Sequence, residues 1–107
     1  MIMAYYLVQA KPVDALLPEL RQKLDNGDIR FMRPFGQALQ YSLENARIQD
    51  DGRAIWEEED YCSPPLAQER AAVLDRHFEE LNVERVEKNK GWKQIASLPG
   101  LWDAQGK

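Results

Sequence analysis

The sequence has few of the residues from which recognisable sites are built. It contains one cysteine, Cys62, and one histidine, His77. A disulfide within the chain is therefore excluded, and a Cys/His metal centre has too few ligands. We predict no metal and no cofactor, and the single thiol favours a cytoplasmic location. A glycine-rich phosphate loop, a G-x-S-x-G elbow and an H-E-x-x-H pattern are also absent.

Long apolar stretches and a surplus of positive charge are lacking as well. No apolar run approaches the ~20 residues that a membrane-spanning helix needs, and residues 1–6 include no basic leader segment. The formal net charge is −4 at pH 7, which argues against a general affinity for nucleic acid. We therefore expect no membrane segment, no signal peptide and no nucleic-acid partner.

The composition is that of an ordinary globular protein. Hydrophobic residues make up 44% and charged residues 30% of the 107 positions, so a single core is expected and disorder is not. We predict one domain over residues 1–102 and a flexible tail over residues 103–107. The charge is uneven, because residues 57–60 are all acidic while basic residues gather near the C-terminus: Arg85, Lys88, Lys90 and Lys93.

The first third of the chain predicts a strand followed by a helix. Residues 3–11 are apolar on both alternating faces, which is typical of a central strand. An apolar stripe at helical spacing follows, and Gly27 is a good stop signal. Pro18 either lies in the first turn of this helix or kinks it. Residues 28–36 predict an irregular connection in which three side chains point inward: Phe31, Met32 and Phe35.

The remainder predicts two strands in a hairpin, a second helix and a fourth strand. Leu39, Tyr41 and Leu43 alternate with polar residues, which favours a strand. Residues 50–52 are a hairpin signal, and residues 53–60 form the returning strand. Ser63 and Pro64 favour a helix start, so residues 64–81 are expected to be helical and residues 83–86 extended. Residues 92–98 fit either a fifth strand or a short helix, and Leu101 and Trp102 are expected to cover an apolar patch.

This order of elements is the β-α-β-β-α-β order of ferredoxin-like α+β domains. Right-handed crossovers would place both helices on one face of a four-stranded antiparallel sheet. The first and third strands would be central, and the second and fourth would lie at the edges. One recurring use of this framework is the dimeric α/β barrel, in which two sheets pack through their open faces and a C-terminal extension completes the dimer.

The acidic run at the end of the third strand is the first candidate site. Strand alternation places Glu57 and Glu59 on the face of Ile55, and Glu58 and Asp60 on the face of Trp56. Buried carboxylates must be paired, hydrogen-bonded or protonated. The alternative interpretation, which we favour, is that the strand stops near Glu57 and that the remaining carboxylates lie in an exposed loop.

The second predicted helix supplies two candidate partners for these carboxylates. At 100° per residue, Arg70 and His77 fall inside the apolar stripe that should face the sheet. The favoured interpretation is structural, as an ion pair and a hydrogen-bonded core histidine. In the catalytic interpretation, His77 is the acid or base, Arg70 holds an anionic group, and Glu57 or Glu59 orients the histidine. Cys62 lies next to the predicted helix start but is expected to be a buried, inert thiol.

Two function hypotheses follow from this framework. The first is a homodimeric binding or interaction module, with a small-molecule ligand or a second copy held on an open sheet face. Four aromatic residues are candidates for that face: Tyr5, Tyr6, Tyr41 and Trp56. The alternative is a cofactor-free enzyme of the dimeric α/β barrel type, an isomerase or monooxygenase-like protein that transfers protons on a small organic molecule. RNA binding is disfavoured because the third strand is acidic.

Overall fold

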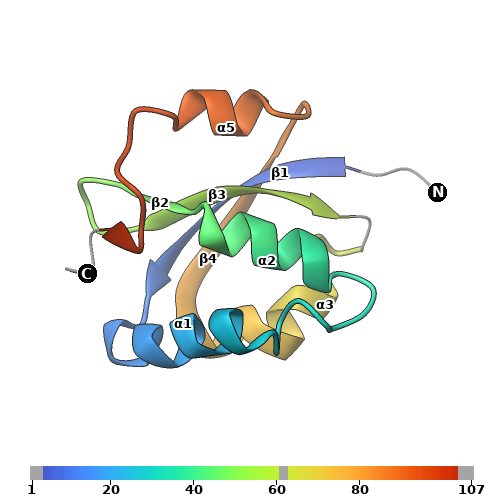
Figure 1. Cartoon of the computed structure of the whole chain (residues 1–107). Coiled ribbons are helices and arrows are strands. Elements are labelled where there is room, and N and C mark those ends of the chain that lie inside the picture. Colours follow the sequence, from blue (N-terminus) through green and yellow to red (C-terminus); the bar gives the residue numbers. More distant parts are fainter. Residues whose placement is uncertain (1–3, 61–62, 104–107) are drawn as a thin grey trace.

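The computed structural model describes residues 4–60 and 63–103, and within them a four-stranded antiparallel sheet in the order β2-β3-β1-β4 (Figure 1). The strands are β1 (Ala4–Pro12), β2 (Arg47–Ile48), β3 (Ala54–Asp60) and β4 (Phe78–Val86). The expected α+β class and the central places of the first and third strands are confirmed. Cys62 and the predicted tail beyond residue 103 lie outside the described residues.

Helices cover both faces of this sheet. On one side pack α1 (Leu17–Asn26), α2 (Gly36–Glu44) and a helical segment made of α3 (Ala67–Glu69), a π-helix (Arg70–Leu74) and α4 (Asp75–His77). The C-terminal extension contributes α5 (Lys90–Gln94), which lies across the opposite side (Figure 1). The sheet face that the sequence predicted to be open is therefore partly covered within one chain.

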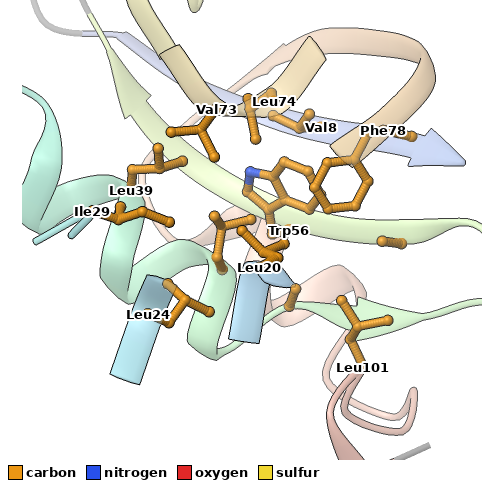
Figure 2. Close-up of a cluster of buried hydrophobic side chains, with 14 of the residues drawn as sticks. Val8, Leu20, Leu24, Ile29, Leu39, Trp56, Val73, Leu74, Phe78 and Leu101 are labelled. Atoms are coloured by element: carbon orange, nitrogen blue, oxygen red, sulfur yellow. The ribbon is translucent and has the colours of Figure 1, made fainter. Parts of the chain in front are cut away.

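The main core forms between the first group of helices and the sheet. Trp56 is fully buried at its centre and packs on Phe78, with ring centroids 5.2 Å apart (Figure 2). Val8 of β1 and the leucines of α1 and α2 surround it. A smaller cluster on the opposite face joins Leu7 and Ile55 to Ile95, the residue that follows α5. Because side chains alternate between the two faces along β1 and β3, both strands contribute apolar residues to a layer on each face of the sheet.

The predicted strand at residues 39–43 is wrong, because these residues belong to α2. Leu39 and Leu43 are four apart and both fully buried, which fits one face of a helix as well as one face of a strand. The true second strand has two residues, which pair with Ala54 and Ile55 of β3, and Arg47 also forms a β-bridge with Gly100. α2 packs along the part of β3 that this short strand leaves without a neighbour, and the Ser42 hydroxyl donates a hydrogen bond to the Glu57 carbonyl at 2.7 Å.

The predicted helix at residues 64–81 is too long at both ends. Helical structure begins at Ala67, after Leu66 in the left-handed region (φ 63°), and it ends at His77. The chain is already extended at Phe78, which pairs with Pro12 at the start of a nine-residue β4. The π-helix within this segment has a wider turn than an α-helix, so the angular position assigned to Arg70 from an α-helical period is wrong.

Some of the smaller predictions are confirmed and others are wrong. Pro18 lies in the first turn of α1, and Gly27 ends that helix with φ 86°. Residues 92–94 are helical rather than extended. Phe31 is 72% exposed and not turned inward. The ferredoxin-like order is not matched element by element, since α2 precedes a two-residue second strand. No helix of the described residues is long and apolar enough to cross a membrane.

Candidate functional site

The acidic run is part of β3, and its side chains alternate between the two faces of the sheet. β3 extends to Asp60, which pairs with Ala4 of β1. Glu57, Glu58 and Asp60 are 3%, 1% and 4% exposed. The interpretation of an exposed loop after Glu57 is therefore wrong, whereas the predicted division of the carboxylates between two faces is confirmed.

Glu57 caps the N-terminus of α5. Its carboxylate accepts hydrogen bonds from the backbone N–H groups of Asn89 (2.9 Å), Gly91 (2.8 Å) and Trp92 (3.2 Å). The first N–H groups of a helix have no partner within the helix, and a carboxylate also complements the helix dipole. A Cβ at Gly91 would lie 2.9 Å from Glu57 Oε1, so a glycine is needed at this close approach. Glu57 thus attaches α5 to the sheet.

Glu59 lies on the same face and interacts with Tyr5 of β1. The Tyr5 hydroxyl donates a hydrogen bond to Glu59 Oε2 at 3.2 Å. Desolvation and the negative charge of Glu59 raise the pKa of the Tyr5 phenol above its usual value. The Lys88 ammonium lies 5.9 Å from the centroid of the Tyr5 ring. The Glu59 carboxylate, the Tyr5 phenol and the Lys88 ammonium therefore lie close together on this face of the sheet.

These groups line a pocket of about 340 Å³ between α2 and α5. We call it the aromatic pocket. Its wall contains the Tyr41 and Trp92 rings, which meet edge to face with centroids 6.0 Å apart. Tyr41 is 60% exposed. The residues that line the pocket come from β1, β3, α2, α5 and the turn before α5: Tyr5, Gln37, Ala38, Tyr41, Ser42, Glu57, Glu59, Lys88, Asn89 and Trp92.

The other face of β3 brings three carboxyl groups together, and we call Glu58, Asp60 and Glu69 the acidic cluster. Glu58 Oε1 accepts a hydrogen bond from the Trp56 indole N–H at 2.9 Å, and Asp60 Oδ2 accepts one from the Leu66 N–H at 2.6 Å. Glu69, the last residue of α3, is 0% exposed, and its carboxyl oxygens accept no hydrogen bond from an N–H or O–H group of another residue but face the carboxyl groups of Glu58 and Asp60. Glu58 Oε2 accepts no such hydrogen bond either.

Burial without partners favours the protonated carboxyl forms. Desolvation, with the charges of Glu69 and Asp60 added, raises the pKa of Glu58 well above its usual range, although the Trp56 N–H opposes this. Desolvation is also the largest cause that raises the pKa of Glu69 to about 7, and the charge of Asp60 adds to it. The acidic cluster therefore holds a carboxyl group that gains and loses its proton near neutral pH.

Arg70 and His77, which the sequence predicted as partners of these carboxylates, lie away from them. Arg70 is paired with Asp75 at 3.1 Å, and its side chain is 45% exposed. His77 is 0% exposed. Its Nδ1 lies 2.9 Å from the Val73 carbonyl and its Nε2 lies 2.9 Å from a Glu19 oxygen. His77 is thus a hydrogen-bonded core residue, as the structural interpretation expected.

The structure therefore does not bring His77, Arg70, Glu57 and Glu59 together. Only Glu57 and Glu59 share a pocket. Sequence reasoning missed Glu69, although a signal was present. Leu66, Glu69 and Val73 lie three and four residues apart, so a helix that begins after Leu66 places all three on its buried face. The prediction considered only Arg70 and His77 among the polar residues near this face.

Comparisons of this chain with protein-family models, with curated proteins and with solved structures find no match. The site must be interpreted from its own geometry. Within residues 4–60 and 63–103, no group of three histidine, cysteine or acidic side chains is placed to hold a metal ion. Among the described residues, the aromatic pocket combines aromatic rings with charged groups, and the acidic cluster gathers buried carboxyl groups.

Proposed function

We propose that this protein is a binding module for a small organic molecule that carries an aromatic ring. The edge-to-face pair of Tyr41 and Trp92 in the aromatic pocket carries this proposal. Aromatic rings bind other rings through offset and edge-to-face contacts. Tyr41 keeps 60% of its surface exposed, so a flat ligand could cover it. A volume of about 340 Å³ lies within the usual range of ligand pockets.

The polar groups of the pocket would orient such a ligand. Glu59 accepts a hydrogen bond from Tyr5, and Lys88 lies over the Tyr5 ring. A ligand with a hydroxyl or amine group can donate to the remaining acceptor sites of the Glu59 carboxylate. The carboxylate of Glu57 is already used by the α5 backbone, so Glu59 and Lys88 are the charged groups available to a ligand.

The test uses small ring compounds and a matched pair of variants. Phenol, indole, benzylammonium and benzoate are titrated into ¹⁵N-labelled protein at millimolar concentration, with acetate and methylammonium as probes without a ring. We expect ring compounds to shift the Trp92 indole N–H signal. Tyr41→Ala should weaken this binding at least fivefold, since Tyr41 supplies one of the two contacting rings. Phe31→Ala is the control, because Phe31 is an aromatic residue 72% exposed outside the pocket.

Two outcomes would overturn the proposal. One is that no ring compound shifts the Trp92 signal at 20 mM. The other is that Tyr41→Ala and Phe31→Ala weaken binding equally, which would indicate non-specific contact with exposed aromatic side chains. Because Tyr41 is largely exposed, the Ala variant is expected to fold normally, and an unchanged amide spectrum outside the pocket verifies this.

We retain the homodimer as a proposal for the assembly, with a ferredoxin-like framework as its basis; the central places of β1 and β3 support that framework. The part of the sheet face around Leu7 and Ile55 is packed against Ile95. A second copy would therefore contact the β4 side, where Val86 lies opposite Tyr5. Light scattering at high concentration tests this, and a monomer would contradict it. The cytoplasmic location and the alternative of a cofactor-free, proton-transferring enzyme remain predictions.

A further inference from the structure

β4 is an exposed edge of the sheet. It runs over nine residues, Phe78–Val86, and pairs along one side with β1. Most of its side chains are exposed: Glu79, Glu80, Asn82, Val83, Glu84 and Arg85. Among the described residues, no backbone-to-backbone hydrogen bond outside the sheet involves residues 79–86. The second side of β4 is therefore a row of backbone donors and acceptors that another strand can pair with.

A bulge limits the usable part of this edge. The register with β1 shifts between Gln9 and Lys11, and Glu80 lies in the left-handed region with φ 53°. The Glu80 carbonyl also accepts a hydrogen bond from the Arg53 guanidinium at 3.4 Å. Bulges and charged side chains protect sheet edges against pairing. Residues 82–86 follow the bulge and pair with β1 in an unbroken register, so this half of the strand can accept a neighbour.

The hydrogen bonds of β3 indicate which backbone groups of β4 point outward. The Glu57 carbonyl accepts a side-chain hydroxyl from α2, so it is turned away from β1. Leu7 of β1 lies opposite Glu57 on one side and opposite Glu84 on the other. In an antiparallel sheet, both backbone groups of a residue point to the same neighbouring strand, and successive residues alternate. Leu7 and Glu84 therefore bond to each other. The N–H and C=O groups of Val83 and Arg85 point away from the sheet.

We propose that two copies of this protein pair antiparallel through β4, edge to edge, so that their sheets join into one. The contact centres on Val83, which lies opposite the partner's Val83. Its side chain is 37% exposed, the one large apolar side chain of β4 that is exposed. The outward N–H and C=O groups of the two Val83 residues would exchange two hydrogen bonds. This inference rests on the homodimer proposed above and specifies its contact.

The charges of β4 favour this register over its neighbours. A two-fold axis through the pair places one residue of β4 opposite itself, because symmetric partners share one face of the sheet. Centring on Val83 places Asn82 opposite the partner's Glu84, and an amide can donate to a carboxylate. Centring on Glu84 would place two carboxylates opposite each other. Centring on Asn82 would place Glu80 opposite the partner's Glu84, and like charges in these positions are destabilising.

The remaining residues of the contact are compatible with the same register. Arg85 lies opposite the partner's Leu81, a half-buried residue whose apolar surface the arginine stem can cover. The interface is limited to residues 80–86 of each chain, and small interfaces are typical of weak, transient association. We therefore expect a dissociation constant on the order of 0.1 mM.

Amide hydrogen exchange tests the contact residue by residue. Exchange is measured by NMR at protein concentrations of about 20 µM and about 1 mM. The Val83 amide is free in the monomer and paired in the dimer, so its exchange should slow about threefold at the higher concentration. The Glu84 amide bonds to β1 within each chain and should change less. Sedimentation equilibrium over the same range gives the dissociation constant.

Two charge variants test the register. Asn82→Lys places an ammonium opposite the partner's Glu84 and should lower the dissociation constant at least threefold. Asn82→Asp places a like charge there and should raise it at least threefold. If the pair were centred on Asn82, both variants would weaken it. Gln22→Lys and Gln22→Asp change the net charge equally at an exposed residue of α1 and should have little effect.

Three results would overturn the proposal. A monomer at 1 mM would overturn this contact and the homodimer together. A dimer in which the Val83 amide exchanges as fast as in the monomer would overturn the edge contact and leave the homodimer standing. Equal effects of the Asn82 and Gln22 variants of the same charge would mean that only net charge matters. Tyr41→Ala should leave association unchanged, so ligand binding in the aromatic pocket and this contact can fail independently.

Discussion

Glu19 and Glu69 are chemically identical side chains in opposite environments. Glu19 of α1 has three partners: the Arg76 guanidinium at 2.5 Å, the His77 ring at 2.9 Å and the Lys23 ammonium at 3.4 Å. Glu69 of α3 is fully buried, has no cationic partner and faces the carboxyl groups of Glu58 and Asp60. Hydrogen bonds from Arg76 are the largest cause that lowers the pKa of Glu19, whereas burial raises that of Glu69 to about 7. The neighbours of a carboxyl group therefore decide in which direction its pKa is shifted.

The two environments have opposite consequences for stability against pH. A raised folded pKa means that the folded state binds more protons than the unfolded state. Glu69 therefore stabilises the protein below its usual pKa of about 4.5, and this stabilisation is lost as the pH rises through about 7. Glu19 behaves in the reverse way, because its stabilisation is present above its usual pKa and is lost in acid. Stability should peak at mildly acidic pH, near about pH 5.

The largest effect expected is that of Glu69→Gln. Glutamine is neutral at every pH and so removes the penalty of ionising a buried carboxyl group. We therefore expect the variant to be more stable than the natural protein by about 2 kcal/mol at pH 8. Urea unfolding at pH 5 and pH 8 measures this. A loss of stability at pH 8 would mean that Glu69 has a partner in solution.

Glu57→Gln sharpens the comparison, because Glu57 is as buried as Glu69 but fully hydrogen-bonded. Its carboxylate accepts three backbone N–H groups at the start of α5. An amide has one acceptor oxygen in place of two, so the variant should lose about 1.5 kcal/mol of stability at neutral pH. Urea unfolding reports the loss, and Glu79→Gln is the control. A gain in stability, as expected for Glu69→Gln, would contradict the capping role.

Glu19→Gln tests the contribution of the ion-paired carboxylate in this comparison. The substitution weakens a contact between α1 and α4 and leaves the buried His77 with a poorer partner. We expect the melting temperature at pH 7 to fall by roughly 5 °C, and the difference from the natural protein to shrink as the pH falls below 4. Thermal unfolding followed by circular dichroism measures both quantities. A difference that is unchanged in acid would rule out a charged Glu19 as the cause.

The smallest effect is expected for Arg70→Ala. Arg70 and Asp75 form an exposed ion pair with side chains 45% and 58% exposed, and such pairs contribute little. The change in unfolding free energy should stay below about 0.5 kcal/mol. Urea unfolding at pH 7 measures this change. A loss of several kcal/mol would indicate that Arg70 pairs with a carboxylate of residues 57–60, as the sequence predicted.

The sequence predicts the sheet better than it predicts the helices. Two-sided apolar alternation in β1 and the turn at Gly52 are local signals, and both central strands follow from them. Leu39 and Leu43 do not distinguish helix from strand, because only the missing strand neighbour of β3 makes α2 favourable there. The alternation of Glu57, Glu58, Glu59 and Asp60 between two faces was predictable. Their burial was not, since it depends on α2, α3 and α5.

Glu69 of the acidic cluster shows the same limit of prediction from the sequence. Glu69 is a common residue in an ordinary helical context, and only its spacing of three residues from Leu66 and four from Val73 marks it as buried. Its position depends on where the helix begins, which is fixed by the left-handed backbone of Leu66 and its hydrogen bond to Asp60. The π-helix that follows turns Arg70 away from the cluster. The left-handed residue and the π-helix thus determine which side chain belongs to the acidic cluster.

The central claim is that Glu69 is a buried carboxyl group whose pKa is raised to about 7 by desolvation beside Glu58 and Asp60. The most direct measurement is a ¹³C NMR titration of the glutamate side-chain carboxyl carbons, with Glu69 assigned from the Glu69→Gln variant. A Glu69 midpoint near pH 7 is the result that this account predicts. A midpoint near 4.5, the usual value of a glutamate carboxyl group, would contradict it.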